Sequence, residues 1–191
     1  MSHNTQDIPL ELLLQAYANG YFPMAAEDNQ EDIEWVLPRI RGLLPIKDIH
    51  IPKSLKKNLR SDQFQVTVDQ CFERVIRACA ETKKGREKTW INEKIIRSFC
   101  ALHRYGFAHS VEVWQHDCLV GGLYGIAMGA AFFGESMFSK KPNASKAALI
   151  HLTARLHKGG FILLDAQLPN PHLAQFGCYE RPHEEYMPQL I

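Results

Sequence analysis

Three strand candidates follow one another directly in the second half of the chain and restrict the folds that it can adopt. They cover residues 108–115, 118–128 and 130–136. The polar run Gln115-His116-Asp117 at the first junction favours a hairpin turn. A helix over 143–158 and a buried-looking strand over 161–166 come next. Strands that are followed by a helix and one further strand predict a mixed sheet covered by helices.

The segment before these strands adds elements of the same kind. Residues 65–68 predict a strand and residues 70–81 a helix, and Asn92 can cap a second helix that Gly106 ends. The resulting order of strand, helices, three strands, helix and strand indicates an α+β class. It is also the order of the acyltransferase fold that many N-acetyltransferases share. We therefore expect a GNAT-like mixed sheet with flanking helices.

The beginning of the chain has a different character. Asp7 is positioned to cap a first helix that ends near Gly20. Recurring prolines then predict an irregular chain over 21–52. We expect residues 1–61 to form a small N-terminal domain and residues 62–191 to form the GNAT-like catalytic domain.

Composition excludes several classes of protein. The net charge of the 191 residues is +1, so the overall charge gives no indication that the chain binds a polyanion. No stretch approaches the roughly 18 apolar residues that a membrane helix needs. The polar N-terminus lacks the apolar core of a signal peptide, which predicts a cytoplasmic protein. The five cysteines form no Cys-x-x-Cys pair, which argues against a disulfide framework and a zinc site, so we expect no metal.

Glycines are frequent in the second and third strand candidates. They are Gly121, Gly122, Gly125, Gly129 and Gly134. Strand glycines indicate bulges, tight packing or close approach to the backbone, and as a group these suggest a crevice in the sheet. Glu135 follows the apolar run of residues 130–133. It is either a charge at the rim or a functional carboxylate with an altered affinity for protons.

A second polar site follows the apolar strand near the end of the chain. Asp165 and Gln167 are two residues apart, so along a strand they would share one face and point together. The alternative is that Asp165 only caps the next turn, as aspartates at strand ends often do.

Familiar catalytic motifs are absent, but basic residues gather in three places. There is no phosphate-binding loop, no Gly-x-Ser-x-Gly elbow and no His-Glu-x-x-His helix. The basic clusters are Lys53, Lys56, Lys57 and Arg60; Lys83, Lys84, Arg86 and Lys88; and Lys140, Lys141 and Lys146. Each cluster alone is typical of a solvated face. Together they can bind RNA phosphates if the fold gathers them on one side.

Several segments, read in order along nearly the whole chain, resemble the leucyl/phenylalanyl-tRNA–protein transferases of bacteria. The matching segments are Gly20 to Met24, Trp35, Pro38-Arg39, Thr89 to Ile91, Ala108 to Trp114, Leu119 to Gly125, Phe133 to Ser139, Asn143 to Lys146 and Leu164 to Gln167. The run Gly-Glu-Ser-Met-Phe-Ser followed by Ala-Ser-Lys is far more specific than an isolated glycine fingerprint.

The resemblance implies an enzyme that moves Leu or Phe, with Met as a further donor, from aminoacyl-tRNA to acceptor proteins that begin with Arg or Lys. The transfer marks those proteins for degradation. The resemblance also implies catalytic and substrate-binding residues. The catalytic residues are Glu135, Asp165 and Gln167, and the substrate-binding residues are Trp35, Trp90, Leu123, Phe132 and Ser139. The residues that we expect to contact tRNA are Lys53, Lys56, Lys57, Lys83 and Lys84.

This chemistry needs no cofactor, because an aminoacyl ester is already activated. The enzyme must position an amine, remove its proton and stabilise the oxyanion. Two alternatives remain at this point. An acetyl-CoA-dependent N-acetyltransferase normally carries a glycine-rich run at a helix N-terminus, which residues 143–146 lack. A non-catalytic RNA-binding module would not explain Glu135 and Asp165 in its groove.

Overall fold

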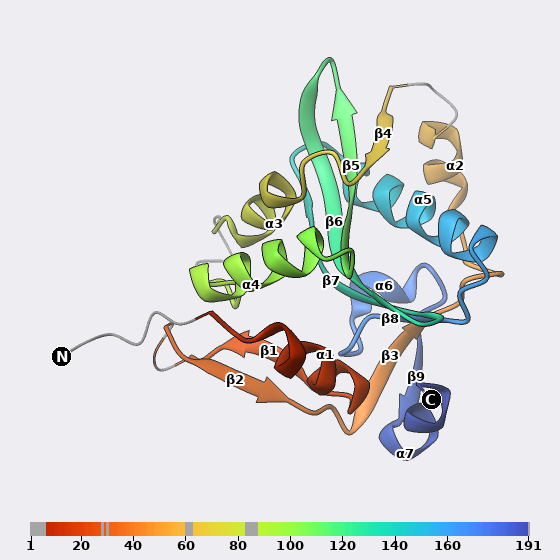
Figure 1. Ribbon diagram of the computed structural model, residues 1–191. Coiled ribbons are helices and arrows are strands. Elements are labelled where there is room, and N and C mark those ends of the chain that lie inside the picture. The colour runs from red at the N-terminus through yellow and green to blue at the C-terminus, as the bar shows by residue number, and fades with distance from the viewer. Residues whose placement is uncertain (1–6, 28, 30, 60–62, 83–87, 191) are drawn as a thin grey trace.

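The fold is that of a computed structural model, which describes residues 7–27, 29, 31–59, 63–82 and 88–190 (Figure 1). Its centre is a seven-stranded sheet in the order β4-β5-β6-β7-β8-β3-β9. The strands are β3 (Ile40–Leu44), β4 (Gln65–Val68), β5 (Ala108–Gln115), β6 (Cys118–Met128), β7 (Ala131–Ser139), β8 (Leu163–Asp165) and β9 (Tyr179–Pro182). Neighbours are antiparallel except β7 and β8, which are parallel. The predicted mixed sheet is confirmed.

Strands β5, β6 and β7 form a meander close to the predicted bounds. His116 and Asp117 connect β5 to β6 with φ of 49° and 60°, the left-handed values that the favoured hairpin turns require. The pairing of β6 with β7 shifts register between Tyr124 and Gly125. This shift makes Glu135 the extra residue of a β-bulge on β7.

Helices cover both faces of the sheet, as its two-sided apolar pattern requires. Helices α3 (Phe72–Ala80) and α4 (Glu93–Arg104) cover one face, and α5 (Ala144–Lys158) covers the other, with α2 (Lys53–Leu59) beside it (Figure 1). Asn92 caps α4 as predicted, because its side chain accepts a hydrogen bond from the Ile95 N–H at 2.9 Å. Successive residues such as Phe132 and Phe133 alternate between the two apolar cores.

The first forty residues contain more regular structure than their prolines predict. Helix α1 (Leu10–Ala18) precedes a two-stranded antiparallel sheet of β1 (Phe22–Ala25) and β2 (Ile33–Val36), and β3 follows. The prediction of an irregular chain over 21–52 is therefore wrong. Asp7 does not cap α1, because Pro9 occupies the cap position. Asp7 instead pairs with Arg97 of α4, with 2.7 Å between carboxylate and guanidinium.

Strand β3 joins the beginning of the chain to its end. It lies between β8 and β9, and Leu43 pairs with Asp165 on one side and with Tyr179 on the other. Three short helical segments complete the C-terminal region: α6 (Pro171–Ala174), α7 (His183–Tyr186) and η1 (Met187–Gln189). The predicted domain boundary at Ser61 lies outside the described residues and stays a prediction.

Candidate active site

The cleft of the molecule opens where two parallel strands separate. Strands β7 and β8 pair over only three positions, from Ala131 opposite Leu163 to Phe133 opposite Asp165. Beyond them β7 continues to Ser139 beside β6, whereas the chain after β8 turns toward β3 at Gln167, with φ of 65°. The space between the separated strands is a cleft of about 540 Å³.

One wall of this cleft is apolar. It is formed by Leu44, Leu123, Met137, Leu149, Leu152, Leu164 and Leu173. These side chains belong to, or pack against, the core beneath α5. The remaining lining includes Trp90, Tyr124, Glu135, Ser139, Lys140 and Asp165. The cleft therefore offers an apolar pocket and a group of polar side chains at the point where the strands part.

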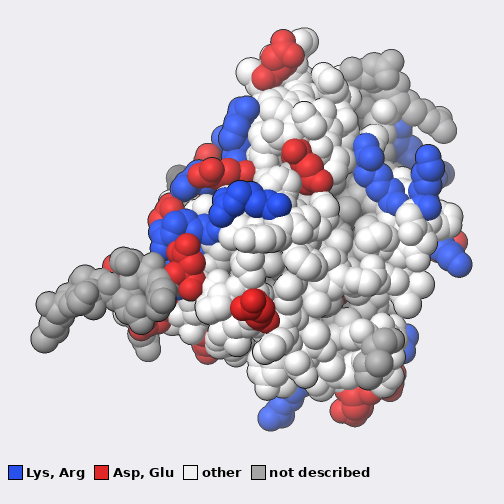
Figure 2. All heavy atoms as spheres, viewed as in Figure 1, with Lys and Arg blue, Asp and Glu red and all other residues white. Residues whose placement is uncertain are grey.

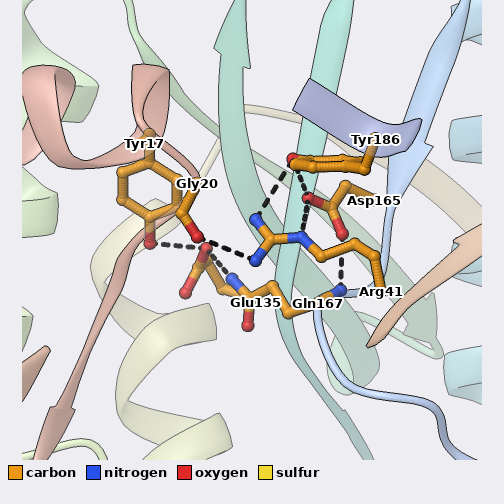
Figure 3. A network of polar contacts seen from close by, with 7 residues as sticks. All are labelled: Tyr17, Gly20, Arg41, Glu135, Asp165, Gln167 and Tyr186. Carbon is orange, nitrogen blue, oxygen red and sulfur yellow. Dashed lines mark hydrogen bonds and ion pairs between the residues drawn. The ribbon is translucent and has the colours of Figure 1, made fainter. Parts of the chain in front are cut away.

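Asp165 is held by donors from three parts of the chain (Figure 3). The Arg41 Nε donates to its Oδ2 at 2.9 Å, and the Tyr186 hydroxyl donates to the same oxygen at 2.5 Å. Its Oδ1 accepts a hydrogen bond from the backbone N–H of Gln167 at 2.7 Å. Burial raises the pKa of Asp165, and Arg41 acts against that rise. Because every donor points at its oxygens, we conclude that the ionised form is the one held.

Arg41 is itself fully buried and satisfied. Its Nη1 donates to the carbonyl of Gly20 at 2.9 Å, and its Nη2 donates to the Tyr186 hydroxyl at 3.1 Å. The guanidinium carbon also lies 4.5 Å from the centre of the Tyr186 ring. Arg41 thus ties the end of α1, strand β8 and helix α7 together around Asp165.

Glu135 has different surroundings. Its Oε1 accepts hydrogen bonds from the Tyr17 hydroxyl at 2.7 Å and from the Gln167 Nε2 at 2.6 Å (Figure 3). Its Oε2 is buried and has no partner among the described residues. Burial raises the pKa of Glu135 to about 8, so the side chain holds a proton at neutral pH. Burial also raises the pKa of Tyr17.

The structure brings several of the expected site residues together. Asp165 and Glu135 both line the cleft, and Gln167 connects them through its backbone N–H and its side-chain amide. Leu123 and Trp90 also line the cleft. Asp165 and Gln167 approach one another through the left-handed turn at Gln167, not through the strand alternation that predicted their meeting.

Two other expected residues, Phe132 and Trp35, lie outside the cleft lining. Phe132 is buried beneath the sheet, where its ring packs against Gly125. Trp35 lies on β2 opposite Pro23 and packs at the edge of the core around α1. Ser139 lines the cleft, and its hydroxyl accepts a hydrogen bond from the Ser145 N–H at 3.0 Å, which joins β7 to the start of α5.

The lysines expected to contact tRNA lie on the surface as far as the structure describes them. Lys53, Lys56 and Lys57 are exposed on α2, whereas Lys83 and Lys84 lie outside the described residues. Figure 2 shows lysine and arginine side chains over α2 and α5, and a second group mixed with acidic side chains over α3 and α4. On α3, Arg77 pairs with Glu73 and Glu93.

The crevice inferred from the glycines exists, but most of these glycines do not form it. A Cβ on Gly121 would meet Ala144 at 2.5 Å, and one on Gly125 would meet the carbonyl of Phe133 at 2.2 Å. These glycines allow α5 and neighbouring strands to approach closely. Of the five, only Gly134 lines the cleft between β7 and β8.

Sequence reasoning missed three residues of the polar network: Tyr17, Arg41 and Tyr186. Arg41 carried a usable signal, because a charged residue within the apolar segment Ile40 to Leu44 needs a buried partner. Tyr17 gave no such signal, since it fits the apolar face of α1. Tyr186 follows a polar C-terminal segment, and nothing local connects it to Asp165.

The mixed sheet with its open β7–β8 pair defines an acyltransferase-like fold. The crystal structure of FemX has this fold, with a TM-score of 0.60 and 10% identity over 95% of this chain and 70% of the FemX chain.

Two family models then specify the protein further. The model described as the N-terminal domain of leucyl/phenylalanyl-tRNA protein transferase matches residues 6–39, and the model of leucyl/phenylalanyl-tRNA protein transferase matches residues 43–191. The chain belongs to this family of aminoacyltransferases, as the sequence motifs predicted.

Relatives named leucyl/phenylalanyl-tRNA–protein transferase match along nearly the whole chain. The relative from Paramagnetospirillum magneticum (strain ATCC 700264 / AMB-1) is 54% identical over 94% of this chain and 86% of its own length. The relative from Rhodopseudomonas palustris (strain BisB18) is 49% identical over 97% of this chain and 81% of its own length.

Two further observations concern membranes and metals. None of the helices in the described part of the chain combines the length and apolar character needed to cross a bilayer. Within the same residues, no group of three His, Cys, Asp or Glu side chains is arranged to hold a metal ion.

Proposed function

We propose that this chain is a cytoplasmic enzyme that transfers Leu or Phe, with Met as a further donor, from aminoacyl-tRNA to acceptor proteins beginning with Arg or Lys. The transfer marks the acceptor for degradation. The observation that carries the proposal is the β7–β8 cleft, which combines an apolar wall with buried carboxyl groups in a member of this transferase family. No cofactor is required, because the ester of an aminoacyl-tRNA is already activated.

The apolar wall is the proposed pocket for the donor's side chain. Leu123, Leu149 and Leu164 line it, and Phe132 belongs to the same core. Apolar pockets discriminate by about 1–3 kcal/mol per methylene group. The side chains of Leu, Phe and Met therefore fit this pocket, whereas those of Ile and Val, which branch at Cβ, fit it poorly. Equal transfer rates for Leu and Val would contradict this pocket.

The tRNA is proposed to bind by stacking and by charge. Trp90 at the cleft, Trp35 on β2 and Ser139 at the end of β7 are proposed to contact the 3′ end. Lys53, Lys56 and Lys57 are proposed to contact phosphates, with Lys83 and Lys84. A second hollow of about 780 Å³ beside α2 is lined by residues 47–53 and Lys56, which supports this placement. Replacing one phosphate-contacting lysine by Gln should reduce the slope of the logarithm of the binding constant against the logarithm of the salt concentration by about one unit.

The polar network is proposed to arrange the reaction. Gln167 orients the attacking amine, and Asp165 holds the backbone of Gln167 in its left-handed conformation. Glu135 supports the acceptor. In this arrangement Asp165 is a positioning residue, because its two oxygens are already engaged by Gln167, Arg41 and Tyr186.

One assay tests the proposal against both alternatives. Labelled Leu, carried on tRNA, is incubated with the protein and a peptide that begins with Arg, with and without ribonuclease. We expect label on the peptide, and we expect ribonuclease treatment to abolish it. Activity that survives ribonuclease but needs acetyl-CoA would establish an N-acetyltransferase, and tRNA binding without transfer would establish a binding module.

A further inference from the structure

The two most exposed large apolar side chains of the described residues lie at one end of the sheet. Ile162 is 73% exposed and Tyr105 is 70% exposed, whereas the next such side chain, Leu168, is 46% exposed. Ile162 directly precedes β8, and Tyr105 directly follows α4. Phe107, which directly precedes β5, is 37% exposed. A single exposed apolar side chain is ordinary, but a group of them indicates an interaction surface.

Hydrogen bonds hold the loops that carry these side chains next to one another. The carbonyl of Phe107 accepts a hydrogen bond from the Ala127 N–H at 2.8 Å, and the carbonyl of Ala130 accepts one from the Ile162 N–H at 2.9 Å. Because neighbouring strands are about 4.8 Å apart, the three steps from β5 to β8 span about 15 Å. The β5–β6 hairpin lies at the opposite end of these strands (Figure 1). We call this surface the three-loop patch, formed by residues 105–107 after α4, 129–130 between β6 and β7, and 159–162 before β8.

Each loop of the three-loop patch projects away from the sheet. Gly106, Gly129 and Gly160 have φ of 79°, 56° and 76°, so each loop turns sharply at a glycine. A Cβ added to any of these three glycines would find no described atom within 4 Å. The loops therefore stand in open space and do not form the walls of a groove. A partner that covers them must present a surface of its own.

Cations accompany the three-loop patch. Arg104 is exposed at the end of α4, and Arg155 and Lys158 are exposed in the last turn of α5. Within the described residues, none of these three side chains belongs to an ion pair. Figure 2 shows an area without charged side chains between the end of α4 and the end of α5. The segments that carry the patch and its cations contain no Asp or Glu: residues 101–111, 127–131 and 154–163.

The shape and chemistry of the three-loop patch distinguish between kinds of partner. An extended or helical peptide needs a free strand edge or a groove, whereas this patch consists of projecting loops at strand ends. Single-stranded RNA needs a basic groove with aromatic rings for its bases, whereas the most exposed side chain here, Ile162, is aliphatic. An anionic lipid surface suits both parts of the patch. Aliphatic and aromatic side chains enter the boundary between headgroups and acyl chains, and Arg and Lys are attracted to the lipid phosphates.

We propose that the three-loop patch docks this protein, from the cytoplasm, on a bilayer surface that is rich in anionic lipid. The side chains of Tyr105, Phe107 and Ile162 enter the headgroup region, and the three neighbouring cations face lipid phosphates. Docking of this kind is peripheral and reversible, because it buries a few side chains only. It goes beyond the proposed transfer reaction and does not depend on it.

The position of the three-loop patch leaves the cleft accessible. The loops precede Ala131 of β7 and Leu163 of β8, whereas the cleft opens after Phe133 and Asp165 on the same two strands. The patch and the cleft therefore lie at opposite ends of the paired part of β7 and β8. A protein that docks through the patch keeps its cleft directed away from the bilayer, where large substrates can reach it.

Co-sedimentation of the full chain with lipid vesicles tests the proposal. One set of vesicles contains equal amounts of phosphatidylglycerol and phosphatidylcholine, and the other contains phosphatidylcholine alone. We expect binding to the anionic vesicles that is much stronger than binding to the neutral ones. Added NaCl should weaken this binding, because salt shortens the range of the attraction between the cations and the lipid phosphates.

A pair of matched substitutions tests the apolar contribution. Ile162→Ser should weaken binding to the anionic vesicles by about tenfold, the scale of one aliphatic side chain that leaves water. Ile40→Ser is the control, because Ile40 is also exposed, at 40%, and lies on β3. Since β3 is antiparallel to β8, with Leu43 opposite Asp165, Ile40 lies beyond the end of β8 that is remote from Ile162. This variant should bind vesicles as the parent does.

A second matched pair tests the cations. The double variant Arg155→Gln and Lys158→Gln should weaken binding by about 25-fold, since each cation near an anionic surface contributes a factor of about five. The double variant Lys56→Gln and Lys57→Gln removes the same charge from α2 and should have an effect of less than about threefold. All of these side chains except Ile40 and Ile162 are charged and exposed, and the two isoleucines are at least 40% exposed. Each variant should therefore unfold at the temperature of the parent, as measured by circular dichroism.

Three outcomes would overturn the inference. The first is that the parent does not bind the anionic vesicles at low salt, or binds the neutral vesicles equally well. The second is that Ile162→Ser and Ile40→Ser weaken binding to the same extent. The third is that the α2 double variant loses as much binding as the α5 double variant, which would show that vesicles attach through α2. Vesicle binding does not require aminoacyl transfer, so these outcomes leave the proposed function untouched.

Discussion

The two carboxyl groups of the cleft lie on neighbouring strands but serve different regions of the molecule. Around Asp165, donors from β3, from α7 and from the following turn engage both oxygens, and one of those donors is a guanidinium. Around Glu135, two uncharged donors share a single oxygen and the other oxygen is unpartnered among the described residues. The first region is complete as a structural centre, whereas the second keeps capacity for a ligand.

Gln167 connects the two regions, since its backbone N–H binds Asp165 and its side-chain amide binds Glu135. Because Asp165 fixes the backbone of Gln167, it also helps to fix the position of the Gln167 amide that donates to Glu135. If this comparison is right, substitutions near Asp165 should mainly reduce stability, and substitutions near Glu135 should mainly change reactivity and the response to pH.

The largest effect on stability is expected from Asp165→Asn. The substitution leaves Arg41 as a buried charge without its counter-ion, which costs about 3–5 kcal/mol of unfolding free energy. Urea denaturation at pH 7 measures the loss. Under the same conditions Glu135→Gln should cost less than about 1.5 kcal/mol, because an amide oxygen can still accept both hydrogen bonds. Equal losses in the two variants would contradict the comparison.

A second substitution provides the control for this prediction. Adding Arg41→Met to Asp165→Asn removes the unpaired charge and should restore part of the stability. Arg77→Met breaks an ion pair with Glu73 and Glu93 on the surface. It should change stability by no more than about 1 kcal/mol.

The pH dependence of stability should originate on the Glu135 side. Because its pKa rises from 4.5 to about 8 on folding, the native state keeps a proton that the unfolded chain has lost. The contribution of Glu135 is therefore fully present below pH 4.5 and is lost as pH rises toward 8. At about 1.4 kcal/mol per pKa unit, the loss amounts to several kcal/mol.

Denaturation of the parent and of Glu135→Gln between pH 5 and 8.5 measures this contribution as a difference. The difference removes the effects of other titrating groups, such as the Asp69–His109 pair. A difference that stays constant across this range would show that Glu135 is ionised throughout, contrary to the comparison.

An intermediate effect is expected from Tyr186→Phe. The variant keeps the ring against Arg41 and removes only the hydroxyl that donates to Asp165. Hydrogen bonds to charged groups contribute about 1.5–3 kcal/mol, so the unfolding free energy should fall by that amount. If the loss is as small as that of an exposed hydroxyl, Asp165 is not held as a carboxylate.

The smallest effect is expected from Tyr17→Phe, the matched change on the other side. Its hydroxyl donates to Glu135, which is protonated near pH 6, and a neutral hydrogen bond contributes about 0.5–1.5 kcal/mol. The cost should increase above pH 8, where Glu135 becomes a carboxylate. A cost at pH 6 equal to that of Tyr186→Phe would remove the distinction between the two regions.

Local patterns predicted the meander well because its pairings are local. Strands β5 and β6 follow alternating apolar positions and are joined by a short polar turn, so neighbouring residues contain the needed information. Asn92 and the helix that it caps were predictable for the same reason. Strand β3 was missed, because its five residues lie among prolines and pair only with residues more than a hundred positions later.

The candidate site was predictable only in part. Glu135 and Asp165 could be found as carboxylates beside apolar runs and Gln167 from its spacing to Asp165, and the family resemblance pointed to the same three residues. The connection between them could not be found, because it depends on a left-handed turn at Gln167 and on Tyr17 and Tyr186 from the two ends of the chain. Such contacts join residues of distant sequence position, and no local pattern records them.

The placement of β3 between β8 and β9 also has a consequence for how the molecule forms during synthesis. Residues 40–44 leave the ribosome well before their partners at 163–165 and 179–182, which are made more than a hundred residues later. The β5–β6–β7 meander can form from local contacts, whereas β3 must wait for pairings of long sequence separation, which form slowly. Arg41 reaches Asp165 and Tyr186 only after those later segments have been made. A nascent chain therefore has no finished cleft until the segment that carries β9 and Tyr186 has been made.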